Sequence, residues 1–489
     1  MSGPHISRRS FLQTSAGAAL SFAAMVNGCG KKLPERPNFV FVLVDDLGWM
    51  DTGCYGGTFY ETPNVDRLAR EGMRFTDAYA ACPVCSPTRA SIMTGKYPAR
   101  VGITDWIPGF KTYNKDPEIL DTPEDLHQLP LEENTIAEAL KRAGYSTFFA
   151  GKWHLGSEGY LPDSQGFDIN LGGNHTGQPF GGYFSPYSNP QLTDGPEGEY
   201  LTDRLGDESV AFLESHAHDE SPFLLYLSFY TVHTPIQPKD NLQQHYADKL
   251  AAMENPPETA FGEEGEAMVR LTQDDPDYAA MVNSMDENLG KVLDALDRLE
   301  LADNTVVIFM SDNGGLSTAP WEAPTSNVPL RAGKGWLYEG GIREPMIVRW
   351  PGVVKPETTC SVPVTSTDFY PTMLEMSGQP LVPKQHADGL SLMPLLKGGK
   401  KLDREAIYWH FPHYHGSRSK PAGAVRAGDW KLIEFFEDDK LELYNLKDDI
   451  GERRDLAQEK LDKVTELHDM MKAWRVDVGA KMPTKVAKK

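Results

Sequence analysis

The stretch Asn38-Phe39-Val40-Phe41-Val42-Leu43-Val44 decides the fold class of this chain. Every residue after Asn38 is apolar, and such a run is typical of a strand that is buried on both faces of a parallel sheet. Two further apolar runs, at residues 222–229 and 304–310, have the same character. The sequence therefore predicts several central strands of one buried sheet.

Segments with helical signals lie between these strands. Residues 62–72 and 134–144 each begin with a capping residue, end in glycine and precede a short predicted strand. A longer helix is predicted at 278–299, after a loop inserted at 254–277. Strand–helix–strand repetition implies right-handed crossovers. We therefore predict an α/β fold, with a large, mostly parallel sheet sandwiched between helices.

The pattern changes beyond Gly398. Short strand-like segments separated by turns lie at 406–409, 423–426, 430–433 and 441–445. A predicted helix at 456–474 and a basic tail follow them. We therefore predict a main domain over 38–398 and a small C-terminal subdomain, an antiparallel sheet plus a helix, over 399–489.

The N-terminus has the features of an export signal. Residues 7–12 contain a twin-arginine pattern, and the apolar stretch at 16–26 is short for a membrane span. Val26-Asn27-Gly28-Cys29 resembles a lipobox, so lipidation and membrane anchorage at Cys29 stand beside simple signal cleavage as alternatives. We predict a signal over 1–29, a linker over 30–37, and a bacterial protein of the periplasm or cell surface.

The charge of the chain excludes one class of partner. The formal net charge is −22 over 489 residues. A chain this acidic, with no basic stripe, is not predicted to bind nucleic acid. Any site for an anionic ligand must be locally basic against the overall charge.

Oxygen-bearing side chains follow two of the predicted central strands. Asp45 and Asp46 come directly after the first strand, and Asp312 and Asn313 follow the strand at 304–310. The carboxyl ends of parallel strands share one edge of a sheet, which is the usual place for a ligand site. Adjacent carboxylates repel unless a cation joins them, and oxygen ligands favour Ca²⁺ or Mg²⁺. A solvated turn is the alternative for either pair alone.

A reactive cysteine is predicted at Cys85. Ser86 is a plausible helix cap and Pro87 suits the first helical position, so the backbone N–H groups of a helix start there. Such a position, with Arg89 one turn on, lowers the pKa of a thiol and attracts anions. An inert, buried cysteine at an ordinary helix start is the alternative.

Cys82 and Cys85 form a C-x-x-C pair. This pattern occurs in redox and zinc sites, but no second pair lies at zinc spacing. We interpret Cys82 as a structural neighbour of Cys85.

Three further segments place cationic or titratable side chains at strand ends or in a glycine-rich loop. Lys152 and His154 alternate after the strand at 145–150, and His233 follows the strand at 222–229. Lys334 lies in the glycine-rich segment 330–343. For any one of these residues alone, the alternative is a lysine on the surface or a structural histidine whose ring nitrogens are hydrogen-bonded within the fold.

Two motifs give the chain a family resemblance. C-x-P-x-R followed by A-S-x-M-T-G from Cys85, and G-Y-x-T-x-x-x-G-K-x-H from Gly144 to His154, resemble the signatures of the formylglycine-dependent sulfatases of the alkaline phosphatase superfamily. The resemblance implies that a maturase oxidises Cys85 to formylglycine (3-oxoalanine), whose hydrated aldehyde is the nucleophile. It also implies a Ca²⁺ site, with Mg²⁺ possible, made by Asp45, Asp46, Asp312, Asn313 and the modified Cys85.

The same resemblance implies a role for each cationic or titratable side chain. Lys152 and Lys334 hold the sulfate oxygens, and His233 protonates the departing alcohol. His154 removes a proton from the remaining hydroxyl, and Arg89 orients the diol. The implied reaction is hydrolysis of a sulfate ester.

Histidine-rich loops are predicted at the rim of the site. Residues 410–418 contain three histidines and an arginine, which suits either a zinc cluster or a rim that contacts sugar and sulfate. We favour the rim and assign substrate binding to His410 and His413. Asn174 and His175, in a glycine-rich loop, are assigned the same way.

The predicted substrate is a sulfated poly- or oligosaccharide. Three alternatives stand beside this function. A phosphonate or phosphodiester hydrolase of the same superfamily can use the same formylglycine. A non-catalytic carbohydrate-binding protein would keep Cys85 unconverted, and a redox protein would use the C-x-x-C pair.

Overall fold

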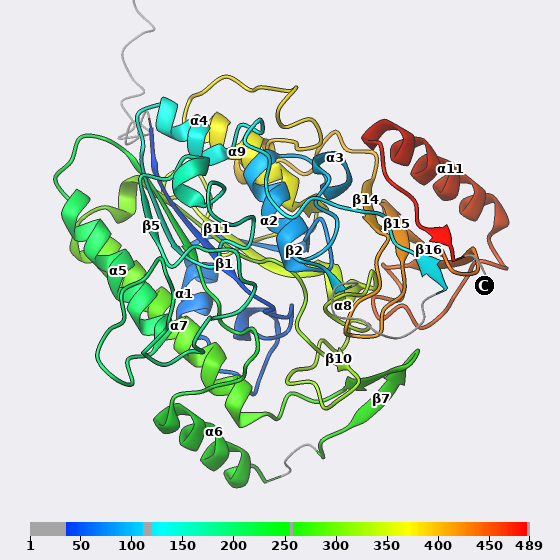
Figure 1. Cartoon of the computed structure of the whole chain (residues 1–489), viewed down its shortest axis with the longest axis horizontal. Helices are drawn as coiled ribbons and strands as arrows, with labels where there is room; N and C mark the ends of the chain where they lie inside the picture. The colour runs from blue at the N-terminus through cyan, green and yellow to red at the C-terminus, as the bar shows by residue number, and fades with distance from the viewer. Residues whose placement is uncertain (1–35, 111–118, 255–257, 487–489) are drawn as a thin grey trace, which may run out of the picture. The chain divides into compact units, whose positions relative to one another are not determined.

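The structure is a computed structural model that describes residues 36–110, 119–254 and 258–486 (Figure 1). The predicted export signal, Cys29 and most of the predicted linker lie outside the described residues. Within the described ranges, no helix combines the length and the apolar character that a membrane span needs.

One large sheet forms the centre of the fold. Its strand order is β12-β2-β11-β9-β1-β6-β4-β5, and β13 pairs with β2. Its strands are β1 (Asn38–Val44), β2 (Met73–Tyr79), β4 (Ser146–Gly151), β5 (Ile169–Leu171), β6 (Phe223–Ser228), β9 (Thr305–Ser311), β11 (Arg343–Arg349), β12 (Thr358–Cys360) and β13 (Val364–Thr365). β1 runs parallel to β6 and β9, whereas β11 runs antiparallel to both of its neighbours. The predicted large, mostly parallel sheet is confirmed.

Helices cover both faces of this sheet (Figure 1). Phe39, Phe41 and Leu43 of β1 pack into one core layer, and the alternate Val40, Val42 and Val44 pack into the other. This alternation explains why the sequence of β1 is apolar throughout. The first layer includes α2 (Cys85–Thr94), α4 (Ile136–Arg142) and α9 (Phe369–Met376). The second includes α1 (Pro63–Glu71), α5 (Leu201–His216), α6 (Asp240–Ala252) and α7 (Pro276–Arg298).

The C-terminal part is an antiparallel sheet with a helix, as predicted. Its strands are β14 (Ile407–Phe411), β15 (Ala422–Ala427), β16 (Trp430–Phe435) and β17 (Lys440–Asn445), and α11 (Leu461–Val478) packs against β15 and β16. Trp409 of β14 is buried and its indole N–H donates to the carbonyl of Ala80 at 2.8 Å. β18 (Thr484–Lys485) pairs with β3 (Leu120–Asp121), so this part of the tail is tied down.

Two predicted details differ from the structure. The helix at the reactive cysteine begins at Cys85 itself, and Ser86 does not cap it, because the Ser86 hydroxyl accepts a hydrogen bond from the backbone N–H of Ile107. The inserted segment is not a simple loop. It contains a hairpin of β7 (Phe261–Glu264) and β8 (Ala267–Arg270), which pairs with β10 (Thr318–Ala319).

The remaining described elements are short. They are α3 (Pro98–Val101), α8 (Glu339–Ile342), α10 (Met393–Leu396) and the 3-10 turns η1 (Gly53–Tyr55), η3 (Pro162–Gln165), η4 (Ala302–Asn304) and η5 (Ser366–Asp368). α8 lies within the glycine-rich segment 330–343, which also contains Lys334.

Candidate active site

Acidic and amide side chains from two strand ends meet at one edge of the main sheet. Val44 of β1 lies opposite Ser311 of β9, so the residues that follow them are neighbours. The side-chain amide of Asn313 donates to Asp46 Oδ1 at 2.8 Å, and the Asp46 backbone N–H faces Asp312 Oδ1 at 3.3 Å. The structure therefore brings together the residues predicted to lie side by side, in a fully buried position.

Three cationic side chains face these carboxylates. Lys152 Nζ lies 2.7 Å from Asp45 Oδ2, and Lys334 Nζ lies 2.7 Å from Asp46 Oδ1. The guanidinium of Arg89 contacts Asp312 Oδ2 through Nε at 2.9 Å and Nη2 at 2.7 Å. Three carboxylates thus balance three cations, and a bound divalent cation would give the site the positive charge that an anionic substrate requires.

The oxygen atoms at this edge fit a hard cation. Asp45 Oδ1 and Asn313 Oδ1 are buried and accept no hydrogen bond from the described residues. Orphaned buried acceptors of this kind are costly unless an ion or water joins them. Carboxylate and amide oxygens are the donors that Ca²⁺ and Mg²⁺ prefer.

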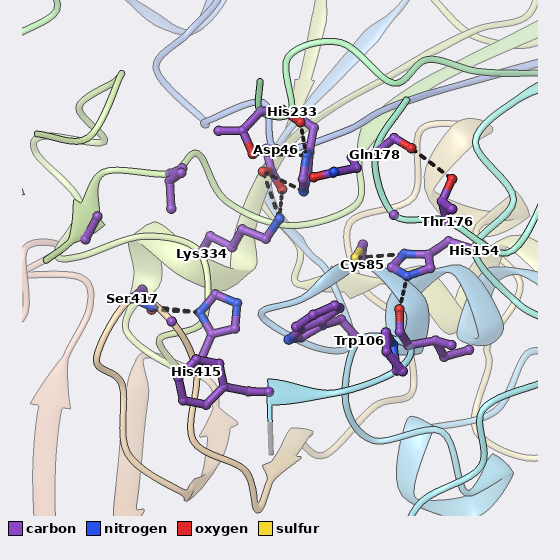
Figure 2. A pocket seen from close by; sticks show the side chains of 18 of the residues that line it. Asp46, Cys85, Trp106, His154, Thr176, Gln178, His233, Lys334, His415 and Ser417 are labelled. Atoms are coloured by element: carbon purple, nitrogen blue, oxygen red, sulfur yellow. Dashed lines mark hydrogen bonds and ion pairs between the residues drawn. The ribbon is translucent and has the colours of Figure 1, made fainter. Parts of the chain in front are cut away.

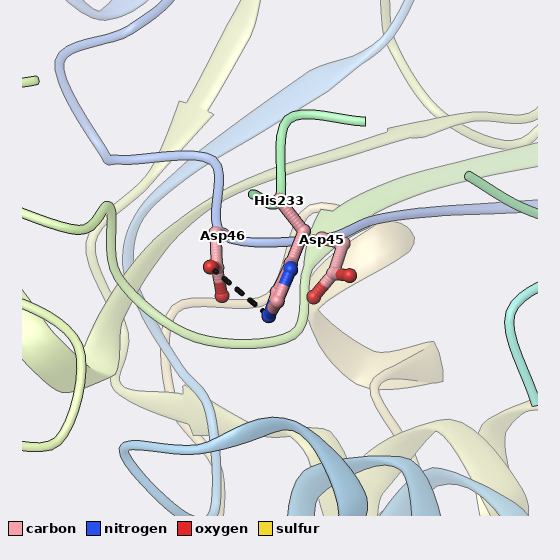
Figure 3. A group of neighbouring side chains, drawn as sticks. All are labelled: Asp45, Asp46 and His233. Carbon is pink, nitrogen blue, oxygen red and sulfur yellow. Dashed lines mark ion pairs between the residues drawn. The ribbon is translucent and has the colours of Figure 1, made fainter. Parts of the chain in front are cut away.

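His233 also lies close to this cluster. One ligand atom each of Asp45, Asp46 and His233 lie within 4.8 Å of one another, the only such group found among the described residues (Figure 3). The sequence analysis assigned His233 to the departing alcohol and did not include it among the metal ligands. Its Nδ1 lies 2.7 Å from the carbonyl of Thr234, which can only accept, so Nδ1 carries the proton and Nε2 faces Asp46 at 3.8 Å. Burial and the charge of Lys334 lower the pKa of His233 to about 3.

Cys85 is the first residue of α2 and contacts His154. The Cys85 sulfur lies 3.3 Å from His154 Nδ1, and the other ring nitrogen, Nε2, lies 2.5 Å from the carbonyl of Ile107. Because that carbonyl can only accept, Nε2 donates and Nδ1 presents a lone pair to the cysteine. Burial lowers the pKa of His154 well below its ordinary value, so the ring is neutral.

The sequence analysis predicted a lowered pKa for the Cys85 thiol, and for the unmodified cysteine this prediction is wrong. Burial raises its pKa, and the nearby Lys152 and Lys334 offset this only in part. Arg89 does not serve the thiol, because its guanidinium is committed to Asp312. Cys82 and Cys85 are both free and buried, and burial raises the pKa of both thiols, which disfavours the thiolate that a redox pair requires.

A cavity of about 660 Å³ opens in front of these groups (Figure 2). Its inner wall includes Asp46, Cys85, His154, His233 and Lys334. Figure 2 shows Cys85 with His154 on one side and Lys334 on the other. Residues scattered over nearly the whole main domain therefore converge on one concave site.

The glycine-rich loop near residue 174 contributes one of its two predicted residues to the cavity. His175 lines it, together with Thr176 and Gln178. Asn174 is buried and is not among the lining residues; its side-chain oxygen accepts from the backbone N–H of Thr176 at 2.8 Å. Asn174 therefore shapes the loop, and its assignment to substrate binding is corrected.

The histidine-rich loop contributes a different histidine from those predicted. His415 lines the cavity. His410 is buried with Nε2 at 2.9 Å from the Lys481 carbonyl, and His413 is buried with Nε2 at 2.8 Å from the Thr104 hydroxyl. His410 lies on the face of β14 opposite Trp409 and Phe411, where the segment at Lys481 and the ring of Phe436 cover it. The substrate-binding assignment of His410 and His413 is corrected, and sequence reasoning missed His415 because the turn that orients it leaves no periodic signal.

Two family models match the chain. The model described as Sulfatase matches residues 37–379, and the model described as N-sulphoglucosamine sulphohydrolase, C-terminal, matches residues 332–477. The chain belongs to the sulfatase family. This sulfatase is accordingly an enzyme that hydrolyses sulfuric esters.

Known sulfatases resemble the chain over most of its length. It is 32% identical to a protein named Sulfatase from Formosa agariphila, covering 92% of this chain and 90% of that one. It is 33% identical to the N-acetylgalactosamine-6-sulfatase of Homo sapiens, covering 77% and 69%. A crystal structure of Ps i-CgsB in complex with k-i-k-neocarrahexaose aligns with a TM-score of 0.74 and 29% identity, covering 93% of this sulfatase and 95% of that chain.

Proposed function

We propose that this sulfatase uses a formylglycine made from Cys85, together with Ca²⁺ or Mg²⁺, to remove sulfate from sulfated poly- or oligosaccharides. One observation supports this most strongly. Cys85, Lys334 and Asp46 line one cavity although they are far apart in the sequence, and Asp46 contacts Asn313 of the same cluster of oxygen donors.

The cation would be held by Asp45, Asp46, Asp312 and Asn313, with the modified residue 85. When bound, it would act as a Lewis acid that draws negative charge from the reacting oxygens. The oxygen donors suit Ca²⁺ or Mg²⁺ better than zinc. Arg89 would hold Asp312 in place through the hydrogen bond from Nε and the ion pair from Nη2, both to Asp312 Oδ2.

The nucleophile would be the hydrated aldehyde of the oxidised Cys85. His154 is the proposed base, because its Nδ1 carries a lone pair and points at the atom where a hydroxyl of residue 85 would stand. The Ile107 carbonyl fixes the proton on the opposite nitrogen, so the ring needs no rearrangement before it accepts a proton.

The substrate sulfate would lie against Lys334 and Lys152. Each ammonium now contacts a carboxylate at 2.7 Å, and a divalent cation beside these carboxylates would leave the lysines able to contact the anion. His233 is the proposed acid for the departing alcohol, because His233 lines the cavity and its Nε2 lies 3.8 Å from Asp46, which lines the same cavity. The negative charge of a bound sulfate would raise the low pKa of His233 and favour its protonated form.

The proposed substrate class follows from the size of the cavity and from the relatives. A cavity of about 660 Å³ is roomy for a single sugar ring. One relative is named for N-acetylgalactosamine 6-sulfate chemistry, and one similar structure contains a neocarrahexaose. These names support a carbohydrate sulfate as the substrate.

The proposal extends to maturation and location. A formylglycine-generating maturase would be the partner that converts Cys85. Residues 1–29 would direct export to the bacterial periplasm or cell surface, with lipidation at Cys29 as the proposed anchor. Membrane fractionation of cells that express the full chain or its Cys29→Ala variant tests the anchorage. We expect the full chain in the membrane fraction and the variant outside it. An unchanged distribution would contradict it.

The central experiment measures activity of the full chain co-expressed with a maturase. We expect release of sulfate from members of a panel of sulfated mono- and oligosaccharides, and much slower release of phosphate from phosphate esters with the same leaving group. Cys85→Ala should abolish the activity, whereas Cys82→Ala is the matched control that should retain it. Equal activity of Cys85→Ala, or a preference for phosphate, would contradict the proposal.

A further inference from the structure

The outer part of the active-site cavity differs in chemistry from its inner part. Among the described residues that line the cavity, Asp46 and Lys334 alone have permanently charged side chains, and these two contact each other at the inner end. The outer lining includes Pro108, Phe110, Leu316, Ala319 and Trp321. Among the described lining residues, this outer wall presents no cation that could neutralise a second anionic group on the substrate.

Trp321 is the most prominent feature of this outer wall. Its side chain is 57% exposed although it lines a cavity. It follows β10, whose Thr318 and Ala319 pair with β8 of the inserted hairpin. The insertion thus supports the wall that presents Trp321. Aromatic side chains are common in the walls of ligand-binding cavities, and the exposed face of Trp321 is accessible to a ligand there.

Phe110 and His415 form another part of the outer lining. Their ring centroids lie 6.5 Å apart, with the planes tilted by 43°. Both residues line the cavity. Phe110 comes from the main domain and His415 from the loop after β14, so the C-terminal sheet completes the outer part of the site.

The protonation of the His415 ring is fixed by its neighbour. His415 Nδ1 accepts from the backbone N–H of Ser417 at 3.2 Å and lies 2.9 Å from the Ser417 hydroxyl. In the neutral ring the proton is therefore on Nε2, the nitrogen that does not face Ser417 (Figure 2). Burial, supported by the charge of Lys334, lowers the pKa of His415 to about 3, which keeps the ring neutral. A neutral N–H donor suits a hydroxyl or ring oxygen and requires no counter-charge.

We propose that Phe110, Trp321 and His415 form a binding subsite for an uncharged sugar ring that adjoins the sulfated ring of the substrate. The C–H face of a pyranose would stack on the indole of Trp321, and a sugar oxygen would accept the Nε2 proton of His415. A neighbouring ring with a carboxylate or a second sulfate would lose its hydration against this wall and would meet no cation among the described lining residues of the outer part. This inference rests on the proposed function, and it adds that the preferred substrates are oligosaccharides with an uncharged neighbouring ring.

The experiment measures binding by isothermal titration calorimetry to the full-length Cys85→Ala protein, which does not turn its ligand over. The probes are matched sets built on galactose 4- and 6-sulfate, N-acetylgalactosamine 4- and 6-sulfate, and N-acetylglucosamine 6-sulfate. Each set contains the monosaccharide, the same ring linked to an uncharged hexose, and the same ring linked to a uronic acid. The variants are studied with the set whose monosaccharide binds most tightly.

We expect the disaccharide with the uncharged hexose to bind roughly three- to tenfold more tightly than its monosaccharide, and the uronic-acid disaccharide to show no such gain. Trp321→Ala should remove the gain without changing the affinity for the monosaccharide, and Trp321→Phe should retain most of it. His415→Leu should reduce the gain, whereas His415→Gln, which keeps an N–H donor, should preserve it.

Several results would overturn the subsite. The first is that in no set does the uncharged disaccharide bind more tightly than its monosaccharide. The second is an equal gain in affinity for the uronic-acid disaccharide. The third is a gain in affinity that remains in Trp321→Ala. The proposed function fails separately, when the matured wild-type protein hydrolyses no sulfate ester. Hydrolysis of sulfated monosaccharides without a disaccharide gain would overturn this inference alone.

Discussion

His154 Nδ1 lies 3.3 Å from the sulfur of Cys85 while the opposite nitrogen of the ring faces the Ile107 carbonyl at 2.5 Å. The two contacts leave one neutral tautomer, with a lone pair directed at residue 85. Gly177 allows this placement, because a Cβ atom there would lie 2.6 Å from His154 Cε1. The ring is therefore fixed in position before any substrate arrives.

We expect His154→Ala to lower kcat by roughly 10²- to 10⁴-fold, the usual contribution of a positioned acid or base, with a smaller change in KM. The measurement is steady-state hydrolysis of a sulfate ester by the matured protein. Conversion of Cys85 must be measured for both proteins, so that lost maturation is not mistaken for lost catalysis. A kcat within a few-fold of wild type at equal conversion would remove His154 from the proposed mechanism.

The grouping of the acidic residues could be predicted from the sequence, because register alone brings the ends of β1 and β9 together. The pKa of the Cys85 thiol could not be predicted from the sequence. Its sequence context indicates a low pKa, but burial depends on packing by distant parts of the chain and has the opposite effect. The same limit applies to Arg89, whose partner Asp312 lies 223 positions away.

Removal of divalent cations should inactivate the protein and lower its Tm. The orphaned oxygens of Asp45 and Asn313 are the physical reason, since a cation that binds only the folded state stabilises it. The measurements are activity and thermal unfolding after EDTA treatment, followed by Ca²⁺ or Mg²⁺ titration.

Asn313→Ala should raise the cation concentration needed for recovery, and Asn304→Ala, before the opposite end of β9, is the matched control. Full activity and an unchanged Tm in EDTA would argue against a catalytic cation.

The stability of the protein should fall between pH 7 and pH 5, in part through His410. Burial lowers the pKa of His410 from 6.5 to about 4, so the unfolded chain binds a proton in this range and the folded chain does not. Stability is therefore greatest above the unfolded pKa and is lost as the pH falls, by about 1–2 kcal/mol for this residue. His410→Asn should reduce the difference between the Tm values at pH 7 and pH 5, with sulfatase activity retained. An unchanged pH dependence would contradict this interpretation of His410.

Which histidine of the histidine-rich loop faces the cavity could not be predicted from the sequence. Three histidines within six residues indicated a rim, but the strand β14 directs His410 inward and the turn at Ser417 directs His415 to the cavity. The inserted segment was predicted as a loop because its acidic and proline-rich sequence has little strand character. Its hairpin gains stability from pairing with the distant β10.

Lys431 forms ion pairs that join the C-terminal sheet to the main domain, and its substitution measures what they contribute to the free energy of unfolding. This lysine of β16 is fully buried between Glu339 and Glu452, at 2.8 Å from each. Lys431→Met leaves the buried Glu452 without its cation, while Glu339 keeps Arg343 Nη1 at 3.1 Å, so we expect the free energy of unfolding to fall by about 3–5 kcal/mol.

Lys440→Met, which removes a largely exposed lysine paired with Glu442, is the matched control and should change it by less than about 1 kcal/mol. Chemical denaturation followed by two probes, one in each part, measures both variants. Separate transitions for residues 38–398 and 399–489 in the wild type would instead show that the predicted subdomain unfolds on its own.

Mass spectrometry of the tryptic peptide 75–89 determines whether Cys85 is converted to formylglycine. In protein from a host that matures sulfatases, we expect residue 85 to have lost one sulfur and two hydrogens and gained one oxygen, while Cys82 in the same peptide remains an alkylatable thiol. A peptide in which both cysteines are alkylated, from protein that hydrolyses sulfate esters at full rate, would contradict the account.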